Sequence, residues 1–224
     1  MKKLKGLIYG ACALIIASIS TTSLLADVSG PYVGIQASIN GLEMNGSSTD
    51  TNSEITTGTA GKTAEIAGIE AGWLIPIVDK VAIGIGLNFV SGDFKIKADA
   101  GAGDNSHAST GDVTVEFADH WTAFIQPALS LTDDTAMFLK IGRTYMDMTM
   151  TGDVTDPNNS VQGSILALGS RSVLPNGAFI QFEGGMRSYD EINVWGGGTN
   201  ISAGHQIKAD PDVAYGAFTF GFQF

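Results

Sequence analysis

The sequence predicts an all-β fold, an eight-stranded antiparallel up-and-down transmembrane β-barrel. Three observations indicate this fold. The last residues, AYGAFTFGFQF, place an aromatic side chain on every second position. Other long segments alternate in the same way, and the connections between them alternate between short and long. Side chains alternate between the two faces of a strand, so one face of each segment is apolar.

A secretory signal peptide is expected at residues 1–26. Lys2, Lys3 and Lys5 form a positive start, an apolar run follows, and small residues lead to a cleavage site after Ala26. The run is shorter than the roughly 20 residues of a spanning helix. Cys12 lies within this run without the residues that usually precede a lipidated cysteine. A single barrel domain is expected at 27–224.

The mature chain is strongly acidic. Residues 27–224 contain nine basic and 23 acidic side chains, a formal net charge of −14, and no cysteine. Such a charge excludes nucleic acid as a partner, and the lack of cysteine excludes disulfides and thiolate sites.

Eight strands are expected, each long for a soluble strand. In the third, Val81, Ile83, Ile85, Leu87 and Phe89 alternate with small or polar residues. The predicted ranges are 32–44, 63–74, 81–97, 113–129, 136–150, 161–173, 178–189 and 214–224.

The connections separate into two kinds. Those at 75–80, 130–135 and 174–177 are short and carry turn residues, and Pro175-Asn176-Gly177 suits a type I turn closed by a glycine bulge. Those at 45–62, 98–112, 151–160 and 190–213 are long and polar. Short turns on one side and long loops on the other are typical of outer-membrane barrels, with the short turns in the periplasm.

The terminal aromatic residues are expected to face lipid. An apolar edge strand invites aggregation in water, but it is stable when it closes a barrel in a membrane. We expect Phe224, Tyr32 and Trp73 to form an aromatic girdle at the periplasmic interface.

The sequence resembles a known group, the small eight-stranded outer-membrane barrels of the OmpA/OmpX and opacity-protein type. LLADVSGPYVGIQAS after the cleavage site and AYGAFTFGFQF at the end carry the resemblance. The ending, with Phe218, Phe220, Phe222 and Phe224, is also similar to the signal that the outer-membrane assembly machinery reads. The resemblance implies location in a bacterial outer membrane and implies no particular activity, because this fold carries several functions.

The interior is expected to hold a buried polar network that fills the barrel, since eight strands leave room only for side chains. The hairpin register places Arg171 opposite Gln181 and diagonal to Glu183, within reach of an arginine. Arg143 and Asp147 fall on the lipid-facing parity, so either they lie among headgroups or a bulge shifts the register. The residues predicted to project inward are Glu70, Glu116, His120, Gln126, Lys140, Arg171, Glu183 and Arg187.

Catalysis is the less favoured alternative. His107 and Ser109, with Glu116 beyond them, are the nearest match to a lipid-modifying triad, but a glycine-rich loop does not fix their geometry. His205 is a predicted loop residue. A soluble lipocalin-like binder is the alternative at the level of the fold.

The predicted function is non-catalytic: a structural protein of the envelope that presents its loops outside the cell. A narrow channel for small solutes or ions through the polar interior is the alternative. Expected partners are outer-membrane lipids, lipopolysaccharide, the assembly machinery and an unknown extracellular partner. The acidic loops suit a repulsive surface or bridging by divalent ions, but no calcium-loop spacing occurs, and no metal site or cofactor is expected. Trp195 is the candidate for contacting a partner.

Overall fold

The computed structural model describes residues 29–49, 53–100, 111–152, 154–155, 158–196 and 205–224. In this part of the chain all regular structure is β. The strands are β1 (Gly30–Thr49), β2 (Ile55–Val78), β3 (Val81–Ser91), β4 (Phe94–Ala100), β5 (Gly111–Ser130), β6 (Thr135–Gly152), β7 (Val154–Thr155), β8 (Asn158–Val173), β9 (Ala178–Tyr189), β10 (Ile192–Gly196) and β11 (Gln206–Gln223).

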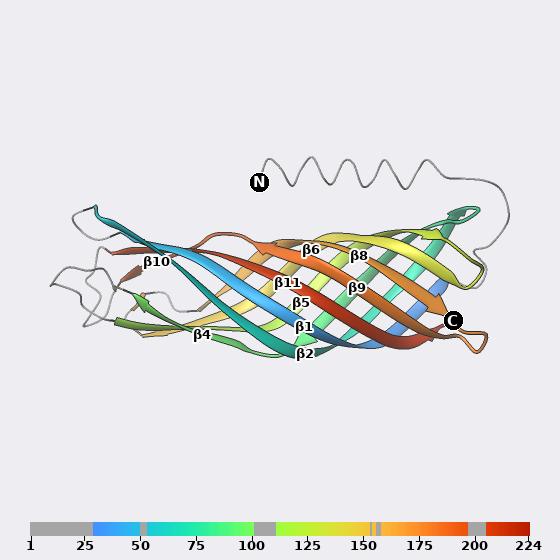
Figure 1. Cartoon of the computed structure of the whole chain (residues 1–224), viewed down its shortest axis with the longest axis horizontal. Coiled ribbons are helices and arrows are strands. Elements are labelled where there is room, and N and C mark those ends of the chain that lie inside the picture. The colour runs from blue at the N-terminus through green and yellow to red at the C-terminus, as the bar shows by residue number, and fades with distance from the viewer. Residues whose placement is uncertain (1–28, 50–52, 101–110, 153, 156–157, 197–204) are drawn as a thin grey trace.

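The long strands form a closed antiparallel ring of eight in the order β1-β2-β3-β5-β6-β8-β9-β11, with β11 pairing back to β1. The short strands β4, β7 and β10 extend it at one end (Figure 1). This confirms the predicted fold class. The prediction of one strand at 81–97 is wrong, since that segment divides into β3 and β4.

The register advances by ten residues around the ring. To see this, one takes the partner of Val33 on β2, then the partner of that residue on the next strand, and so on around the ring. The series passes through Leu87 and Arg143 and returns to β1 at Glu43 instead of Val33. Such a stagger tilts the strands, typically by 35–45°, and closes an eight-stranded sheet around a space that side chains fill.

Short turns and the C-terminus lie at the end opposite β4 and β10 (Figure 1). In the turn after β8, the Gly177 amide donates to the Leu174 carbonyl over 2.9 Å, and Gly177 has a φ of 81°. These are features of the predicted type I turn with a glycine bulge. In the turn before β6, hydroxyls of Thr132 and Thr135 donate to Asp134 and lower the pKa of its carboxyl group.

Much of the sequence expected in two long loops is strand. Residues 45–49 pair with 55–59, so β1 and β2 form a hairpin that reaches far beyond the predicted strands. In the same way β11 begins at Gln206 rather than at 214. The polar composition of these segments suggested loops, but polar side chains exposed to water do not prevent backbone pairing.

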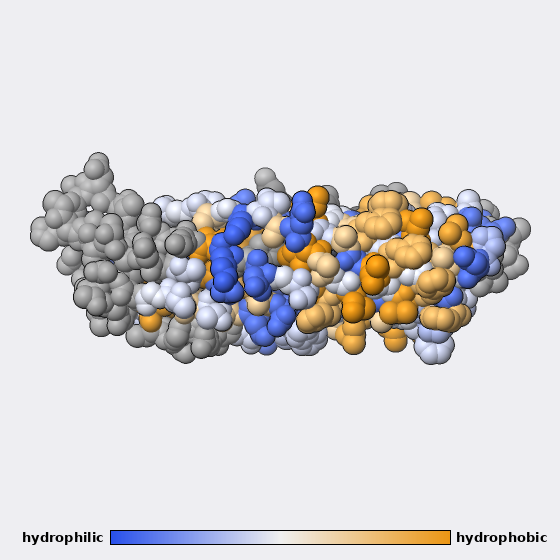
Figure 2. Space-filling model, turned by 90° about the horizontal axis from the view of Figure 1, so that it is seen from below, coloured by the Kyte–Doolittle hydropathy of each residue, from blue (hydrophilic) through white to orange (hydrophobic). Residues whose placement is uncertain are grey.

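The outer wall has an apolar belt in the half that ends in the short turns, and the described part of the other half is mainly polar (Figure 2). Exposed side chains of the belt include Ile35, Trp73, Leu87 and Phe220. Trp121 stacks on Tyr145 with 4.1 Å between ring centroids, where the belt gives way to charged residues. Arg143 and Asp147 face outward in this region, with no register shift between β6 and β8.

The polarity of the buried side chains changes along the axis of the barrel. In the middle of the belt the buried side chains on β1 are polar, namely Gln36, Ser38 and Asn40, and toward the short turns aromatic side chains such as Tyr32 and Phe179 are buried. Beyond the belt they are apolar, as Leu42 and Met44 are on the same strand. From the middle of the belt outward along β1, the wall thus faces a polar core where its outside is apolar, and an apolar core where its outside is polar.

Among the described residues, no helix is long and apolar enough to cross a membrane.

Candidate functional site: the polar interior of the barrel

A layer of four charged side chains crosses the barrel at the level of the belt. The Lys140 ammonium donates to Glu70 over 2.7 Å and to Glu183. The Arg171 guanidinium lies 3.6 Å from the other oxygen of Glu70. We call Glu70, Lys140, Arg171 and Glu183 the ionic layer. Its two cations balance its two carboxylates.

Neutral hydrogen-bonding groups complete the ionic layer. Gln181 accepts from Arg171 over 2.6 and 2.9 Å, and its amide donates to Glu70 and Glu183, each over 3.1 Å. The Tyr215 hydroxyl donates to Glu183 over 3.0 Å. Each carboxylate therefore has several donors, which buried charges require.

Arg171 does not contact Glu183 as the hairpin register suggested. It does lie opposite Gln181 as predicted. However, Glu183 is occupied by Lys140 and Tyr215, and Arg171 instead meets Glu70, which comes from a distant strand. The register of one hairpin does not show which side chains of other strands reach the same place across the lumen.

Aromatic rings cover the ionic layer toward the short turns. The Arg171 guanidinium lies 3.7 Å from the ring centroid of Tyr32 and 4.5 Å from that of Phe179. Lys140 lies 4.5 Å from the ring of Phe124. Gly86 faces this ring, since a Cβ at Gly86 would lie 2.5 Å from it. The placement of Tyr32 in the lipid-facing girdle is therefore wrong: it shares the inward parity of Gln36 and is 3 % exposed.

A second group of polar side chains lies between the ionic layer and the apolar core. Arg187 donates to Asn40 over 3.0 Å, and its guanidinium lies 4.0 Å from the ring centroid of Tyr215. The His120 ring nitrogen and the Tyr189 hydroxyl are 3.2 Å apart, and Thr144 lies beside Tyr189. We call Asn40, His120, Thr144, Arg187 and Tyr189 the polar layer.

The apolar core closes the lumen on the side of the polar layer that is away from the short turns. It includes Phe117, Val213 and three methionines at alternate positions of β6, namely Met146, Met148 and Met150. These side chains are at most 4 % exposed. The lumen is therefore filled by aromatic, ionic, polar and apolar side chains in succession.

Glu116 does not belong to the interior network, contrary to the sequence-based prediction. A bulge between Ala118 and Trp121 adds one residue to β5 relative to β6. Beyond the bulge the parity of β5 is reversed, so Phe117 is buried while Glu116 faces outward and pairs with Lys95 over 3.0 Å. Asp119, inside the bulge, has a φ of 47°, a backbone conformation that aspartate tolerates.

The structure places the other predicted interior residues in the lumen. Glu70, His120, Gln126, Lys140, Arg171, Glu183 and Arg187 are buried, each at most 7 % exposed. Sequence reasoning missed Tyr215 as a member of the interior. Its parity on β11, opposite to that of the terminal phenylalanines, is the signal that identifies it.

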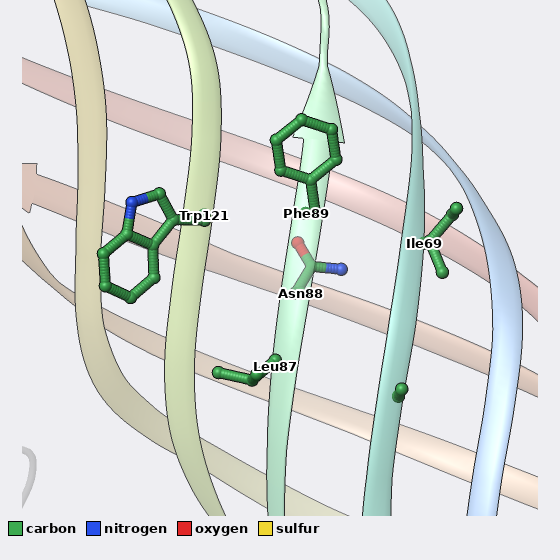
Figure 3. Close-up of a pocket in the computed structure, with 6 residues that line it drawn as sticks. Ile69, Leu87, Asn88, Phe89 and Trp121 are labelled. Atoms are coloured by element: carbon green, nitrogen blue, oxygen red, sulfur yellow. The ribbon is translucent and has the colours of Figure 1, made fainter.

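The outer wall carries a shallow apolar groove of about 420 Å³ between β2, β3 and β5. Ile69, Leu87, Phe89 and Trp121 surround it, with Trp121 projecting from β5 on one side (Figure 3). A second groove, of about 510 Å³, lies on the polar half between β1, β2 and β11 and is lined by Asn45, Thr59, Glu191, Lys208 and Asp210, among others.

Apart from Tyr32, the predicted surface aromatics are exposed. Trp73 and Phe224 lie near the short turns, 53 % and 77 % exposed. Phe218, Phe220 and Phe222 face outward on β11. Trp195 is 52 % exposed on β10, where it pairs with Thr155 and Gln206.

The candidate catalytic group is not assembled by the described residues. His107 and Ser109 lie outside them, and Glu116 is paired with Lys95. Within the described ranges, no group of three or more His, Cys, Asp or Glu side chains could hold a metal ion.

Comparison with known proteins identifies the architecture. No protein-family model matches the chain, and no curated protein matches it. The outer membrane protein OprG from Pseudomonas aeruginosa is 16 % identical, with a TM-score of 0.53, over 88 % of this chain and 97 % of that one.

Two further structures show weaker similarity. Ail, the attachment invasion locus protein of Yersinia pestis, is 8 % identical, with a TM-score of 0.44, over 84 % of this chain and 98 % of its own. The outer membrane protease OmpT from Escherichia coli is 7 % identical, with a TM-score of 0.44, over 92 % and 99 %. Together with the closed ring of strands, the likeness to OprG gives this chain the fold of the bacterial outer-membrane β-barrels.

Proposed function

We propose that this protein is a non-catalytic barrel of a bacterial outer membrane, closed to solutes, which supports the envelope and presents a polar extension outside the cell. The carrying observation is the exchange of polarity along the wall. An apolar outer belt around a polar core fits a membrane, and a polar outside around an apolar core fits water. Short turns and the C-terminus then lie in the periplasm.

The filled lumen supports a closed barrel rather than a pore. Solute passage would require the ionic layer to separate and the apolar core, with Phe117 and Met148, to open. Breaking buried ion pairs costs about 3–5 kcal/mol for each partner removed. A closed barrel therefore serves through its surface and not through its lumen.

Single-channel conductance tests this proposal. The mature chain, residues 27–224, is refolded into a planar bilayer, together with variants Glu183→Gln and Arg187→Gln. The expected result is no discrete conductance in the unchanged chain. Discrete openings that either variant alters would contradict the closed barrel and support the second candidate, a narrow channel. The continuous polar side chains from Gln126 to Arg187 favour that candidate.

We propose lipopolysaccharide and outer-membrane lipids as the partners of the outer wall. Trp121 and Tyr145 mark the upper edge of the belt, and the polar groove with Glu191, Lys208 and Asp210 lies beyond it, at the level expected for sugars and phosphates. Trp195 is the proposed contact for an extracellular partner. A strain that lacks the gene should be more sensitive to detergents. The unchanged gene should restore resistance, and a gene encoding Trp195→Ala should restore it as well. Unchanged sensitivity in the deletion strain would contradict an envelope role.

We also propose that the outer-membrane assembly machinery reads the terminal residues Phe218, Phe220, Phe222 and Phe224. The Phe224 amide donates to the Pro31 carbonyl over 2.8 Å, so the signal is also part of the closing seam. Deletion of Phe224 should reduce the fraction found in the outer membrane while Phe224→Tyr does not. To separate recognition from closure, both variants are also refolded in detergent, where Phe224 deletion should still yield a barrel.

A further inference from the structure

The polar layer contains a buried charge that no carboxylate balances. Arg187 is 2 % exposed. Lys140 and Arg171 balance Glu70 and Glu183 in the ionic layer, but among the described residues no acidic side chain forms an ion pair with Arg187. The described interior of the barrel thus has one positive charge in excess.

The contacts of Arg187 are all with neutral groups. One terminal nitrogen donates to the Asn40 amide oxygen over 3.0 Å, and the guanidinium faces the ring of Tyr215. The Nε atom is buried and has no hydrogen-bond partner within the described part of the chain. The charge of Arg187 acts on His120, and any proton gained by the His120 ring would increase the excess charge rather than cancel it.

This environment differs from that of Arg171. One terminal nitrogen of Arg171 also has no partner, but its guanidinium lies 3.6 Å from a Glu70 oxygen and so has a counter-charge. Arg187 has no such counter-charge. A buried ion without one is costly, and an unsatisfied N–H adds to this cost.

We propose that the polar layer binds one small monovalent inorganic anion, such as chloride, against Arg187. The anion would accept a charge-assisted hydrogen bond from Nε and would make the described interior neutral. The Thr144 hydroxyl donates to the Trp121 carbonyl over 3.5 Å, so the Tyr189 hydroxyl is the further donor in the same layer when the His120 ring donates to it. A carboxylate or phosphate ligand is disfavoured because aromatic and apolar side chains close the lumen on both sides.

Two measurements test the proposal. Crystals of the barrel refolded in sodium bromide should show an anomalous peak within hydrogen-bond distance of Arg187 Nε. In urea unfolding, chloride should stabilise the barrel relative to gluconate at equal ionic strength. At a chloride concentration 100 times Kd, the unfolding equilibrium constant should fall about 100-fold.

The control separates this site from general salt effects. Arg187→Met should abolish the difference between chloride and gluconate, while Arg143→Met, which removes an exposed outward arginine, should retain it. The proposal is overturned if the refolded Arg187→Met barrel retains the chloride effect, or if the unchanged protein shows no bromide peak at Arg187. The bromide experiment decides the question even if Arg187→Met fails to refold.

Discussion

Lys140 is the residue on which the ionic layer depends, because its ammonium contacts both carboxylates. Without it, Glu183 would retain only the neutral donors Gln181 and Tyr215. A buried pair replaced as a whole costs little, whereas a buried charge left alone is strongly destabilising. The ionic layer should therefore respond to substitutions in a strongly non-additive way.

We expect Lys140→Met to lower the free energy of unfolding by about 3–5 kcal/mol. The double variant Lys140→Met with Glu183→Gln should lose much less than the two single variants together, because it removes one charge of each sign and leaves Glu70 with Arg171. Urea unfolding followed by the heat-dependent gel shift measures all four proteins of this cycle. Additive effects would show that the two side chains do not interact.

At the scale of the strand, β5 shows what alternation alone could not predict. The parity of the strands placed Glu70, Lys140 and Arg187 in the lumen, since one assignment of faces holds along β2, β6 and β9. In β5 the same reasoning misplaced Glu116, because one extra residue in the bulge exchanges the two faces. A bulge of this kind leaves no clear sign in the sequence.

Cysteine labelling tests the reversed parity, since a chain cleaved after Ala26 has no cysteine of its own. In intact cells, a membrane-impermeant maleimide should label Glu116→Cys rapidly and Phe117→Cys slowly, because labelling needs an exposed thiolate. Deletion of Asp119 should reverse the order of the two rates if the barrel still forms. Faster labelling at Phe117→Cys with the bulge intact would contradict the assignment.

The seam between β1 and β11 places two acids opposite each other. Glu43 pairs with Asp212, and both face outward in the polar half. Like charges at such a position are destabilising, so Glu43→Gln should raise the free energy of unfolding by about 0.2–1 kcal/mol.

Salt should reduce this gain, because it screens exposed charges. Asp147→Asn is the matched control, since Asp147 is exposed but lies opposite Ala118 and Ser160. It should change the stability less than Glu43→Gln does. Equal effects of the two substitutions would indicate that net charge matters and not the pairing.

For the whole molecule, the exchange of polarity sets which substitutions are tolerated. Met148 and Thr149 are neighbours on β6, the first buried in the apolar core and the second exposed. Met148→Asp should cost about 3–5 kcal/mol by burying an unpaired charge. Thr149→Asp should stay within about 0.5 kcal/mol. Similar losses in urea unfolding would contradict the apolar core.

The same exchange appears in the sequence as a change of parity along a strand. In β1 the alternating apolar residues are odd-numbered up to Ile39 and even-numbered from Leu42. In β6 the same change occurs between Ile141, which is odd-numbered, and the even-numbered methionines that begin at Met146. The predicted strands 32–44 and 136–150 both run past this change, so the polar composition of the following segments led to the prediction of loops. In β1 and β6, that change lies where the outside of the wall turns from apolar to polar.

The closing seam has a consequence for synthesis and folding. Tyr32 pairs with Gln223, so the first and last strands must meet before any closed ring exists. Contacts of such long sequence separation form slowly, since loop closure costs entropy before the contacts compensate it. A chain truncated before β11 would leave β1 and β9 as open edges, exposed to pairing with other chains. The topology therefore couples the two ends of the chain: the ring closes only when the last strand reaches the first, and until then each of them keeps one unpaired edge.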